Sequence, residues 1–278
     1  MYIQSNIPAM NVLRIYQMNN LLFSKSMERL ASGYRINRSA DDPAGLAISE
    51  NMKFQIYGLK QASRNIQDGI SMLQTAEGAM DGIHSMLQRL NVLANQSSNG
   101  IYSDKDRSML QKEFSQLVEE IKNIAESSNF NGVHLLNGDG TRDLGSNKLG
   151  LILQVGTGSE DIMVLDMPNV LNSLEDIMDL DISTDEGAKE AIDALMSAVD
   201  NVSYDRAKLG AYQNRLEHRN NYLLTYAENL TAAHSRIRDT DMAEEMMILT
   251  RARILSQVSV MMLAQANALP NQVMRLLG

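Results

Sequence analysis

The 278-residue sequence contains no cysteine and no tryptophan, and its aromatic residues are limited to 9 Tyr and 4 Phe. Without cysteine the chain cannot form a disulfide, a thiolate nucleophile, an iron–sulfur cluster or a cysteine zinc site. The histidines His84, His134, His218 and His234 show no His-Glu-x-x-His or His-x-x-x-His spacing, which excludes the local metal motifs. We therefore expect no metal, no other cofactor and no redox chemistry of the chain itself.

Positive charge is also scarce, because 25 Lys and Arg stand against 34 Asp and Glu, a net charge of −9. Nucleic-acid binding needs clustered positive charge, so we expect no nucleic-acid partner. The distribution is uneven: residues 1–38 carry +4 and residues 246–278 carry +3, which leaves −16 for the residues between them. The two ends of the chain thus share one character, apolar, mildly basic and nearly free of acidic residues.

Long apolar runs are absent as well. The longest, such as residues 258–264, are interrupted by Ser or Gln and fall short of the roughly 18 residues that a membrane span needs. The first eight residues lack the basic start and apolar stretch of a secretory signal peptide. We expect a soluble chain without membrane insertion that is either cytosolic or exported without a cleaved signal.

Helical periodicity is the dominant pattern that the sequence does show. From Ile48 to Ala94 apolar residues recur over 46 residues in 13 steps, a mean step of about 3.5 that is typical of coiled coils. Asp42 can cap this helix ahead of a first-turn proline. A second pattern begins at the cap Ser103 and a third runs from residue 188 to 237. The spacing predicts helices over 43–99, 104–128 and 186–237.

The third helical pattern carries polar residues at four seam positions, Arg206, Gln213, Asn220 and His234. Such residues fix the register of a bundle at some cost in stability. Between the second and third helices, residues 149–166 alternate apolar and small or polar positions around a Gly-rich turn, which predicts one β-hairpin. We interpret 137–148 as a loop and 168–187 as a connector.

Both ends of the chain show an apolar seam of the same kind. Its members are Ile3, Ile7, Met10, Leu13, Tyr16, Phe23, Met27 and Leu30 at one end, and Leu255, Val258, Met262, Ala266, Leu269, Val273 and Leu276 at the other. Neither helix can bury its seam alone, so we expect an antiparallel pair of terminal helices. The methionine-rich stretch 246–262 fits a core or an adaptable interface, because thioether side chains repack easily.

No group of polar residues suggests catalysis. Asp41 and Asp42 precede a proline, and helix capping explains them better than an acid–base pair. Gly156-Thr157-Gly158 lacks the strand–loop–helix context of a dinucleotide loop and is interpreted as a hairpin turn. We expect a protein that is not an enzyme, with no catalytic or cofactor-binding residues.

Several residue strings resemble the signatures of bacterial flagellins. ERLASGYRIN at 28–37, followed by DDPAGLAI at 41–48, is similar to the N-terminal block of that family. Further similar blocks lie at 65–71, 74–80, 130–132, 209–216, 235–241 and 263–267. They occur in both halves of the chain and in the family's order, whereas the family's variable outer insert is missing.

The resemblance implies a mainly α fold: an elongated antiparallel coiled-coil or helical-bundle rod with one small β-hairpin, plus paired terminal helices that form a coiled-coil tube domain. The inner tube domain would comprise residues 1–38 and 243–278, and the rod domain residues 39–242, with no outer variable domain. The terminal seam residues named above would form the subunit interface of the inner tube.

The resemblance also implies a function: a structural subunit of the bacterial flagellar filament. The chain would be exported unfolded through the flagellar type III channel and would self-assemble through its terminal helices into an extracellular helical tube used for swimming. Implied partners are further copies of the chain, an export chaperone on the C-terminal helix, and the flagellar cap and hook-associated proteins.

Vertebrate Toll-like receptor 5 is a further partner that the resemblance implies. Its contact patch would comprise Leu87, Gln88, Arg89, Leu93, Gln96 and Glu113, although Leu87 also lies on the apolar seam. Two alternative functions remain open from the residues: a hook–filament junction protein of the flagellum, and a secreted coiled-coil effector or adhesin, for which the matching apolar termini would have no purpose.

Overall fold

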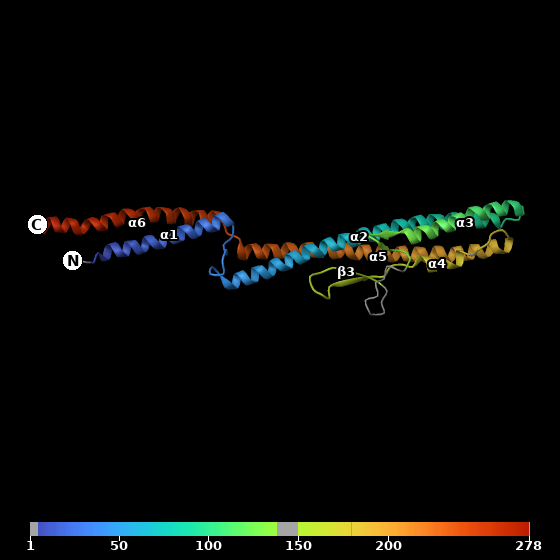
Figure 1. The fold of residues 1–278 in the computed structure, drawn as a ribbon, viewed down its shortest axis with the longest axis horizontal. Coiled ribbons are helices and arrows are strands. Elements are labelled where there is room, and N and C mark those ends of the chain that lie inside the picture. Colours follow the sequence, from blue (N-terminus) through green and yellow to red (C-terminus); the bar gives the residue numbers. More distant parts are fainter. Residues whose placement is uncertain (1–4, 138–149, 179, 278) are drawn as a thin grey trace. The chain divides into compact units, whose positions relative to one another are not determined.

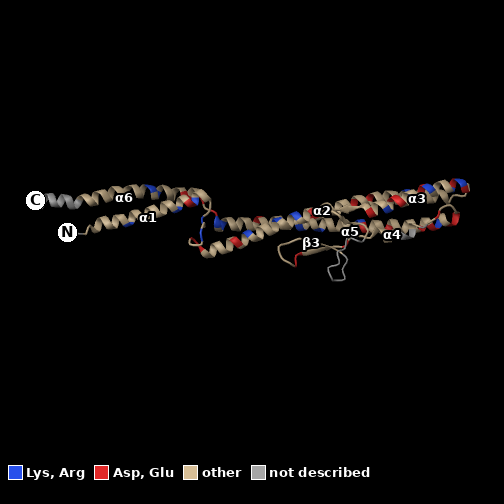
Figure 2. Cartoon of the chain, viewed as in Figure 1, with Lys and Arg blue, Asp and Glu red and all other residues tan. Residues whose placement is uncertain are grey.

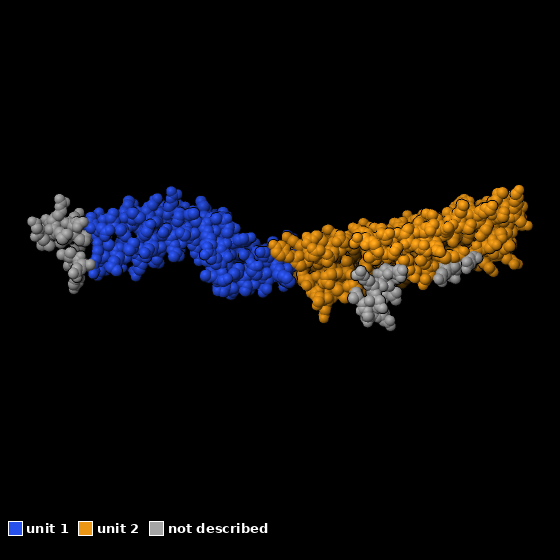
Figure 3. All heavy atoms as spheres, in the orientation of Figure 1, with its two compact units in different colours: residues 1–56, 228–278 blue, residues 57–227 orange. Residues whose placement is uncertain are grey.

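The computed structural model describes residues 5–137, 150–178 and 180–277, with the side chains of 173, 175, 176 and 269–277 left out. Apart from Asn137, the predicted loop at 137–148 therefore lies outside the described residues. The chain forms two compact units, one of residues 1–56 and 228–278 and one of residues 57–227 (Figure 3). We refer to them as unit 1 and unit 2.

Unit 2 is built around three helices, α2 (Pro43–Ser97), α3 (Asp104–Ser127) and α5 (Asp185–Arg238), whose ends lie within two residues of the predicted ones (Figure 1). Helices α2 and α5 run in opposite directions, because Ser63 Oγ donates to Asn220 Oδ1 at 2.7 Å and Arg206 Nη2 lies 2.9 Å from Asp81 Oδ1. Two of the four polar seam residues thus bridge to α2, as expected for residues that set register.

The core of unit 2 follows the predicted seam. On α2 the positions that recur every seven residues are at most 2 % exposed: Leu59, Ile66, Leu73, Met80 and Leu87. On α5 the corresponding positions are Leu195, Val202, Leu209, Leu216 and Leu223. Phe114 of α3 is the single aromatic residue in the core of the described chain, so the aliphatic composition is that of a helix-on-helix core. Ile48, which begins the predicted seam, is instead 49 % exposed.

The predicted caps Asp42 and Ser103 hold the starts of two helices, and Asp106 adds a contact that the sequence interpretation did not include. Asp42 Oδ1 accepts a hydrogen bond from Gly45 N at 2.9 Å and caps α2. Ser103 Oγ accepts from Asp106 N, while the Asp106 carboxylate accepts from Ser103 N at 3.2 Å, which completes a capping box at α3. The hydrogen bonds from Ser103 lower the pKa of Asp106.

Strands β3 (Leu151–Gln154) and β4 (Ile162–Leu165) form an antiparallel hairpin within the predicted 149–166. The hairpin lies on α2, where Asn65 Nδ2 donates to Gln154 O at 3.3 Å. Gly69 permits this approach, because a Cβ there would come within 2.6 Å of Leu153 Cδ2.

The sequence interpretation missed three short elements. Strands β1 (Asn129–Phe130) and β2 (Val133–His134) pair around a turn in which Asn131 and Gly132 have positive φ, 52° and 80°. Helix α4 (Val170–Met178) lies inside the stretch interpreted only as a connector. Strands of two residues and a helix of nine are too short to show a clear period.

Unit 1 contains the predicted pair of terminal helices, α1 (Ile7–Ser32) and α6 (Met242–Leu277). They lie side by side (Figure 1) and run antiparallel, because Asn6 Nδ2 donates to Ala266 O at 2.9 Å, whereas Arg29 Nη1 lies 3.4 Å from Glu245 Oε2. The mainly helical architecture with a small hairpin, expected from the sequence, is confirmed.

The connection between α1 and α2 is hydrogen-bonded to the connection between α5 and α6 within unit 1. Gly33, at φ 75°, ends α1, and its carbonyl accepts from Thr240 N at 3.0 Å. Arg35 N donates to Arg238 O at 2.7 Å, and the Tyr34 ring lies 4.9 Å from the Arg238 guanidinium. Two sequence blocks singled out above, 28–37 and 235–241, thus form one joint.

Substitution of Leu87 by Ala should lower the free energy of unfolding by about 2–5 kcal/mol, because the side chain is fully buried and a cavity would remain. Urea unfolding followed by circular dichroism measures this. Gln88→Ala, one residue along on the exposed face, is the control and should change the value by less than about 0.5 kcal/mol. Equal effects of the two substitutions would contradict the observed packing.

Protonation of Asp41 should destabilise unit 1. A hydrogen bond from Lys25 and backbone hydrogen bonds from Arg38 and Asn37 lower the pKa of this carboxyl from 3.8 to about 2. The side chain is 17 % exposed, so the stabilisation is at most about 2 kcal/mol, reduced further by solvent screening. It is present above about pH 4 and is lost as the pH falls toward 2.

Thermal unfolding of the unmodified chain and Asp41→Asn at pH 5 and pH 2 measures this loss. The melting temperature of Asp41→Asn should fall less between the two pH values than that of the unmodified chain. Asp68→Asn, at an exposed carboxylate of α2, should behave like the unmodified chain. An identical fall for all three proteins would show that the Asp41 interactions contribute nothing.

Candidate subunit interface

The seam between α1 and α6 is made of small and polar side chains. On α6 the buried positions recur every seven residues and are at most 7 % exposed: Glu245, Ala252, Ser259 and Ala266. On α1 the buried residues are Asn19 and Ser26, and Asn19 Nδ2 donates to Ser259 Oγ at 3.4 Å. Seven-residue spacing on both helices is the pattern of a coiled coil, but here the buried positions hold small or polar side chains in place of the usual large apolar ones.

A nearly buried ion pair lies at one end of this seam. The Arg29 and Glu245 side chains are 25 % and 6 % exposed, and Arg29 Nε and Glu245 Oε1 have no hydrogen-bond partner among the described residues. Desolvation offsets much of the attraction in such a pair, so its net stabilisation is small. Together with Asn19, the pair defines one register of α1 against α6, as single polar seam residues do in coiled coils.

The large apolar side chains of the terminal helices are directed away from the seam. Predicted interface residues that are 41–65 % exposed are Ile7, Met10, Leu13 and Met27 of α1 and Leu255, Val258 and Met262 of α6. Tyr16, Phe23 and Leu30 are half-buried, at positions in phase with the seam residues of α1. The predicted pairing is therefore correct, but most of the predicted apolar stripe is not what the pair buries.

The remaining predicted interface residues divide into two groups. Ala266 is buried in the seam itself. Ile3 and the side chains of Leu269, Val273 and Leu276 lie outside the described part of the chain.

Further exposed apolar residues lie outside the single predicted stripe. They are Ile15, Met18, Leu21 and Leu22 on α1 and Met246, Met247, Ile254, Val260 and Met261 on α6. A search for a single apolar stripe with a 3.5-residue step overlooks these residues. The small number of charged residues along α1 and α6 would have revealed them (Figure 2). We call the exposed apolar residues of both helices, predicted and missed, the outer face.

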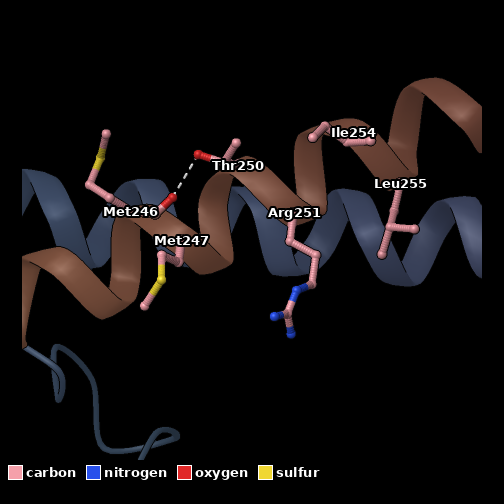
Figure 4. A pocket seen from close by; sticks show the side chains of 6 residues that line it. All are labelled: Met246, Met247, Thr250, Arg251, Ile254 and Leu255. Carbon is pink, nitrogen blue, oxygen red and sulfur yellow. Dashed lines mark hydrogen bonds between the residues drawn. The ribbon is translucent and has the colours of Figure 1, made fainter.

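A shallow groove on α6 illustrates the outer face. Figure 4 shows side chains projecting from the helix, and the groove is lined by Met246, Met247, Thr250, Arg251, Ile254 and Leu255. The Thr250 hydroxyl donates to Met246 O at 2.8 Å, so it is satisfied within the helix. Of the two interpretations of the methionine-rich stretch, the exposed positions fit an adaptable surface and not a core.

The segment Met242–Ala268 of α6 is long and apolar enough, by length and composition alone, to cross a membrane, and 11 % of its most apolar window is buried. The sequence interpretation considered only uninterrupted apolar runs, which Ser and Gln break. An average over the helix tolerates these residues. The apolar outer face accounts for this composition.

The residues of the implied receptor patch do not all reach the surface of unit 2. Leu87 and Leu93 are fully buried in the bundle, so their side chains are not accessible in the single chain. Their part in receptor recognition stays a prediction. Gln88 and Arg89 are exposed, and Arg89 Nη2 lies 2.6 Å from Glu113 Oε1. Gln96 is half-buried, and its amide donates to the Tyr102 hydroxyl at 3.2 Å.

No group of three or more His, Asp or Glu side chains is placed to hold a metal ion within the described ranges. The comparisons with known proteins concern the helices that carry the surfaces described above.

The chain matches two family models, the bacterial flagellin N-terminal helical region over residues 3–141 and the bacterial flagellin C-terminal helical region over residues 192–277. It is 50 % identical over 279 residues to a flagellin of Halalkalibacterium halodurans, with both chains covered completely. It is 42 % identical over 285 residues to the flagellar filament 31.3 kDa core protein of Treponema maltophilum, again with complete coverage of both.

Solved structures agree with this assignment. The crystal structure of Bacillus cereus flagellin is 31 % identical, with a TM-score of 0.51 over 62 % of this chain and 94 % of that one. A putative flagellar hook-associated protein from Vibrio parahaemolyticus has a TM-score of 0.60 over 72 % of this chain and 100 % of that one, but at 17 % identity it shares the fold alone. The chain therefore belongs to the bacterial flagellins, the structural proteins that build the flagellar filament.

Proposed function

We propose that this flagellin assembles into its filament through the outer face of α1 and α6, which further copies of the chain cover. The observation that carries the proposal is the arrangement of unit 1, with small or polar residues at the buried positions of the helix pair and most of the large apolar residues exposed outside it. Met10 at 65 % and Met247 at 64 % exposure are examples. Exposed apolar patches of this kind mark interaction surfaces.

The energetics favour association. Full burial of one large aliphatic side chain contributes roughly 1.5–3 kcal/mol, and the outer face presents many such side chains. An isolated helix pair exposes them to water in every copy. If each copy contacts the next through two different surfaces, and the rotation between copies does not close a ring, a helical fibre results.

The difference in charge between the acid-poor ends of the chain and the acidic residues between them supports a radial arrangement in the fibre. Residues 1–38 and 243–278 would form the inner tube, where the outer face is covered, and residues 39–242 the surrounding rod. The acidic residues between the two ends of the chain would then face solvent and keep the polymer soluble.

The proposed function also includes export from the cell and partner binding, in which the outer face would take part. The chain would leave the cell unfolded through the flagellar channel, without a cleaved signal peptide, and join an extracellular filament. Before assembly, an export chaperone on α6 would cover its apolar outer face, for which flexible methionine side chains are suited. Flagellar cap and hook-associated proteins would meet the same type of surface at the filament ends.

Met10→Lys and Met262→Lys should each raise the critical concentration for polymerisation at least tenfold, because each places an unpaired charge in the covered interface. Sedimentation after seeding with sheared filament fragments measures the critical concentration. Both residues are more than half exposed in the single chain, so circular dichroism should show the same helix content as the unmodified protein.

Gln67→Lys supplies the matched control, since this exposed residue of α2 lies in unit 2. It should leave the critical concentration within about threefold of the unmodified value. Deletion of 1–38 or of 243–278 should abolish polymerisation. Polymerisation of either truncated chain at the unmodified concentration would refute the proposed interface.

Recognition by Toll-like receptor 5 is supported by one observation, the accessible Arg89–Glu113 ion pair with Gln88 beside it. An Arg89→Ala, Glu113→Ala double variant should reduce receptor signalling in reporter cells, with unchanged unfolding because an exposed pair contributes little stability. Lys122→Ala, which alters another exposed ion pair of α3, is the control. Equal signalling by the double variant and the unmodified chain would argue against this patch.

A further inference from the structure

Aromatic side chains in unit 2 lie mostly on the surface. Four of the nine tyrosines fall within residues 204–226 of α5, and Tyr204, Tyr222 and Tyr226 are 72 %, 56 % and 39 % exposed. Tyrosine and arginine are the residues most enriched among those that dominate binding energy at interfaces. The assembly proposed above uses unit 1, and it leaves this surface of α5 without a role.

Arginine and tyrosine residues form a continuous stripe on α5. Tyr212, Arg215, Arg219, Tyr222 and Tyr226 recur at helical steps of three and four, so they share one face. The Arg215 guanidinium lies 5.9 Å from the Tyr212 ring and that of Arg219 5.4 Å from the Tyr222 ring. The Tyr222 and Tyr226 rings stack with centroids 6.0 Å apart. We call these five residues the Arg/Tyr stripe; stacking restrains its side chains before any partner binds.

The Arg/Tyr stripe borders a hollow between α5 and the β3–β4 hairpin. Arg215, Arg219 and Tyr222 line one side of it. On the other side Ile162 and Val164 of β4 are 46 % and 39 % exposed. Glu160 and Asp161 also line the hollow, and Asp161 Oδ1 lies 3.6 Å from Arg219 Nη2. Arg215 forms no ion pair among the described residues, so the surface offers apolar area next to one unpaired cation and suits a partner that is acidic and partly apolar.

The first part of α5 has that complementary chemistry. Residues 185–205 contain six acidic residues and one basic residue, whereas residues 206–227 contain four basic residues and one acidic residue. Of these four basic residues, Arg206, Lys208 and Arg219 pair with carboxylates within unit 2, which leaves Arg215 as the cation available to a partner. An exposed stripe in the first part consists of Glu186, Glu190, Asp193, Met196, Asp200 and Tyr204. We call it the acidic stripe; Met196, at 59 % exposure, supplies apolar area within it.

We propose that the Arg/Tyr stripe of one copy binds the acidic stripe of the next copy along the filament, as a second self-association surface. A single straight helix cannot bring its own two stripes together, so the complementary surface must come from another chain. Two parallel copies displaced along the helix axis by on the order of 40 Å place one stripe beside the other. The contact is heterologous, as an open fibre requires. The inference rests on the proposed self-assembly and assigns it a partner surface.

Charge reversal on each stripe, followed by the combined reversal, tests this pairing. Arg215→Glu, and separately the double variant Glu190→Lys, Asp193→Lys, should each raise the critical concentration about tenfold or more in seeded assembly at low salt, because like charges would face each other. The variant that combines all three substitutions should return to within about threefold of the unmodified chain, since the complementarity is restored with opposite sign.

Arg64→Glu is the matched control, because it makes the same charge change at an exposed position of α2 in unit 2. It should leave the critical concentration unchanged. Circular dichroism and thermal unfolding of each single chain should match the unmodified protein, since the substituted side chains are exposed. As a measurement free of substitutions, raising NaCl from 0.05 to 1 M should raise the critical concentration of the unmodified chain by weakening the charge pairs.

The outcomes separate the two proposals. Failure of the unmodified chain to extend seeds would refute self-assembly itself. Extension of seeds by Arg215→Glu at the unmodified critical concentration would leave self-assembly intact and overturn the stripe pairing. An Arg64→Glu effect as large as that of Arg215→Glu, or a combined variant as weak as its components, would also overturn the pairing, because net charge alone would then explain the result.

Discussion

Close pairing of α1 with α6 through small polar side chains determines what the rest of unit 1 can do. Ala252 and Ala266 occupy little space between the helices, and Asn19 meets Ser259 there. Most of the large apolar residues of both helices are exposed outside this seam, where the proposed assembly would cover them.

The two units have the same seven-residue spacing of buried positions, but they bury different kinds of side chain. In unit 2 the 3.5-residue seam places Leu73 and Leu216 in a closed aliphatic core, where helix packs on helix. In unit 1 the seven-residue spacing holds Glu245 and Ser259 inside instead. The joint formed by Gly33, Arg35 and Arg238 lies where α1 connects to α2 and α5 connects to α6. Backbone groups of the two connections form hydrogen bonds with each other there.

Sequence periodicity predicted the long helices, the hairpin and the antiparallel terminal pair, because each extends over enough residues for its pattern to repeat. It could not say which face of α1 is buried. Met10 belongs to the predicted apolar seam, which was chosen for its hydrophobicity. The structure instead buries Asn19, on another face of α1, and leaves Met10 65 % exposed. In the proposed assembly, further copies of the chain would supply the hydrophobic partner of Met10. The burial of Leu93 was likewise not foreseen, because it depends on packing that a motif comparison does not measure.

The methionines of α6 carry a chemical consequence. Met246, Met247, Met261 and Met262 are all more than half exposed, which leaves their thioethers open to oxidants whenever the chain is not in a polymer. Sulfoxide formation would convert flexible apolar side chains into polar ones on the surface that assembly has to dehydrate. An oxidised chain would keep its folded rod but would assemble poorly. Oxidants would therefore affect free subunits more than subunits already enclosed in a filament.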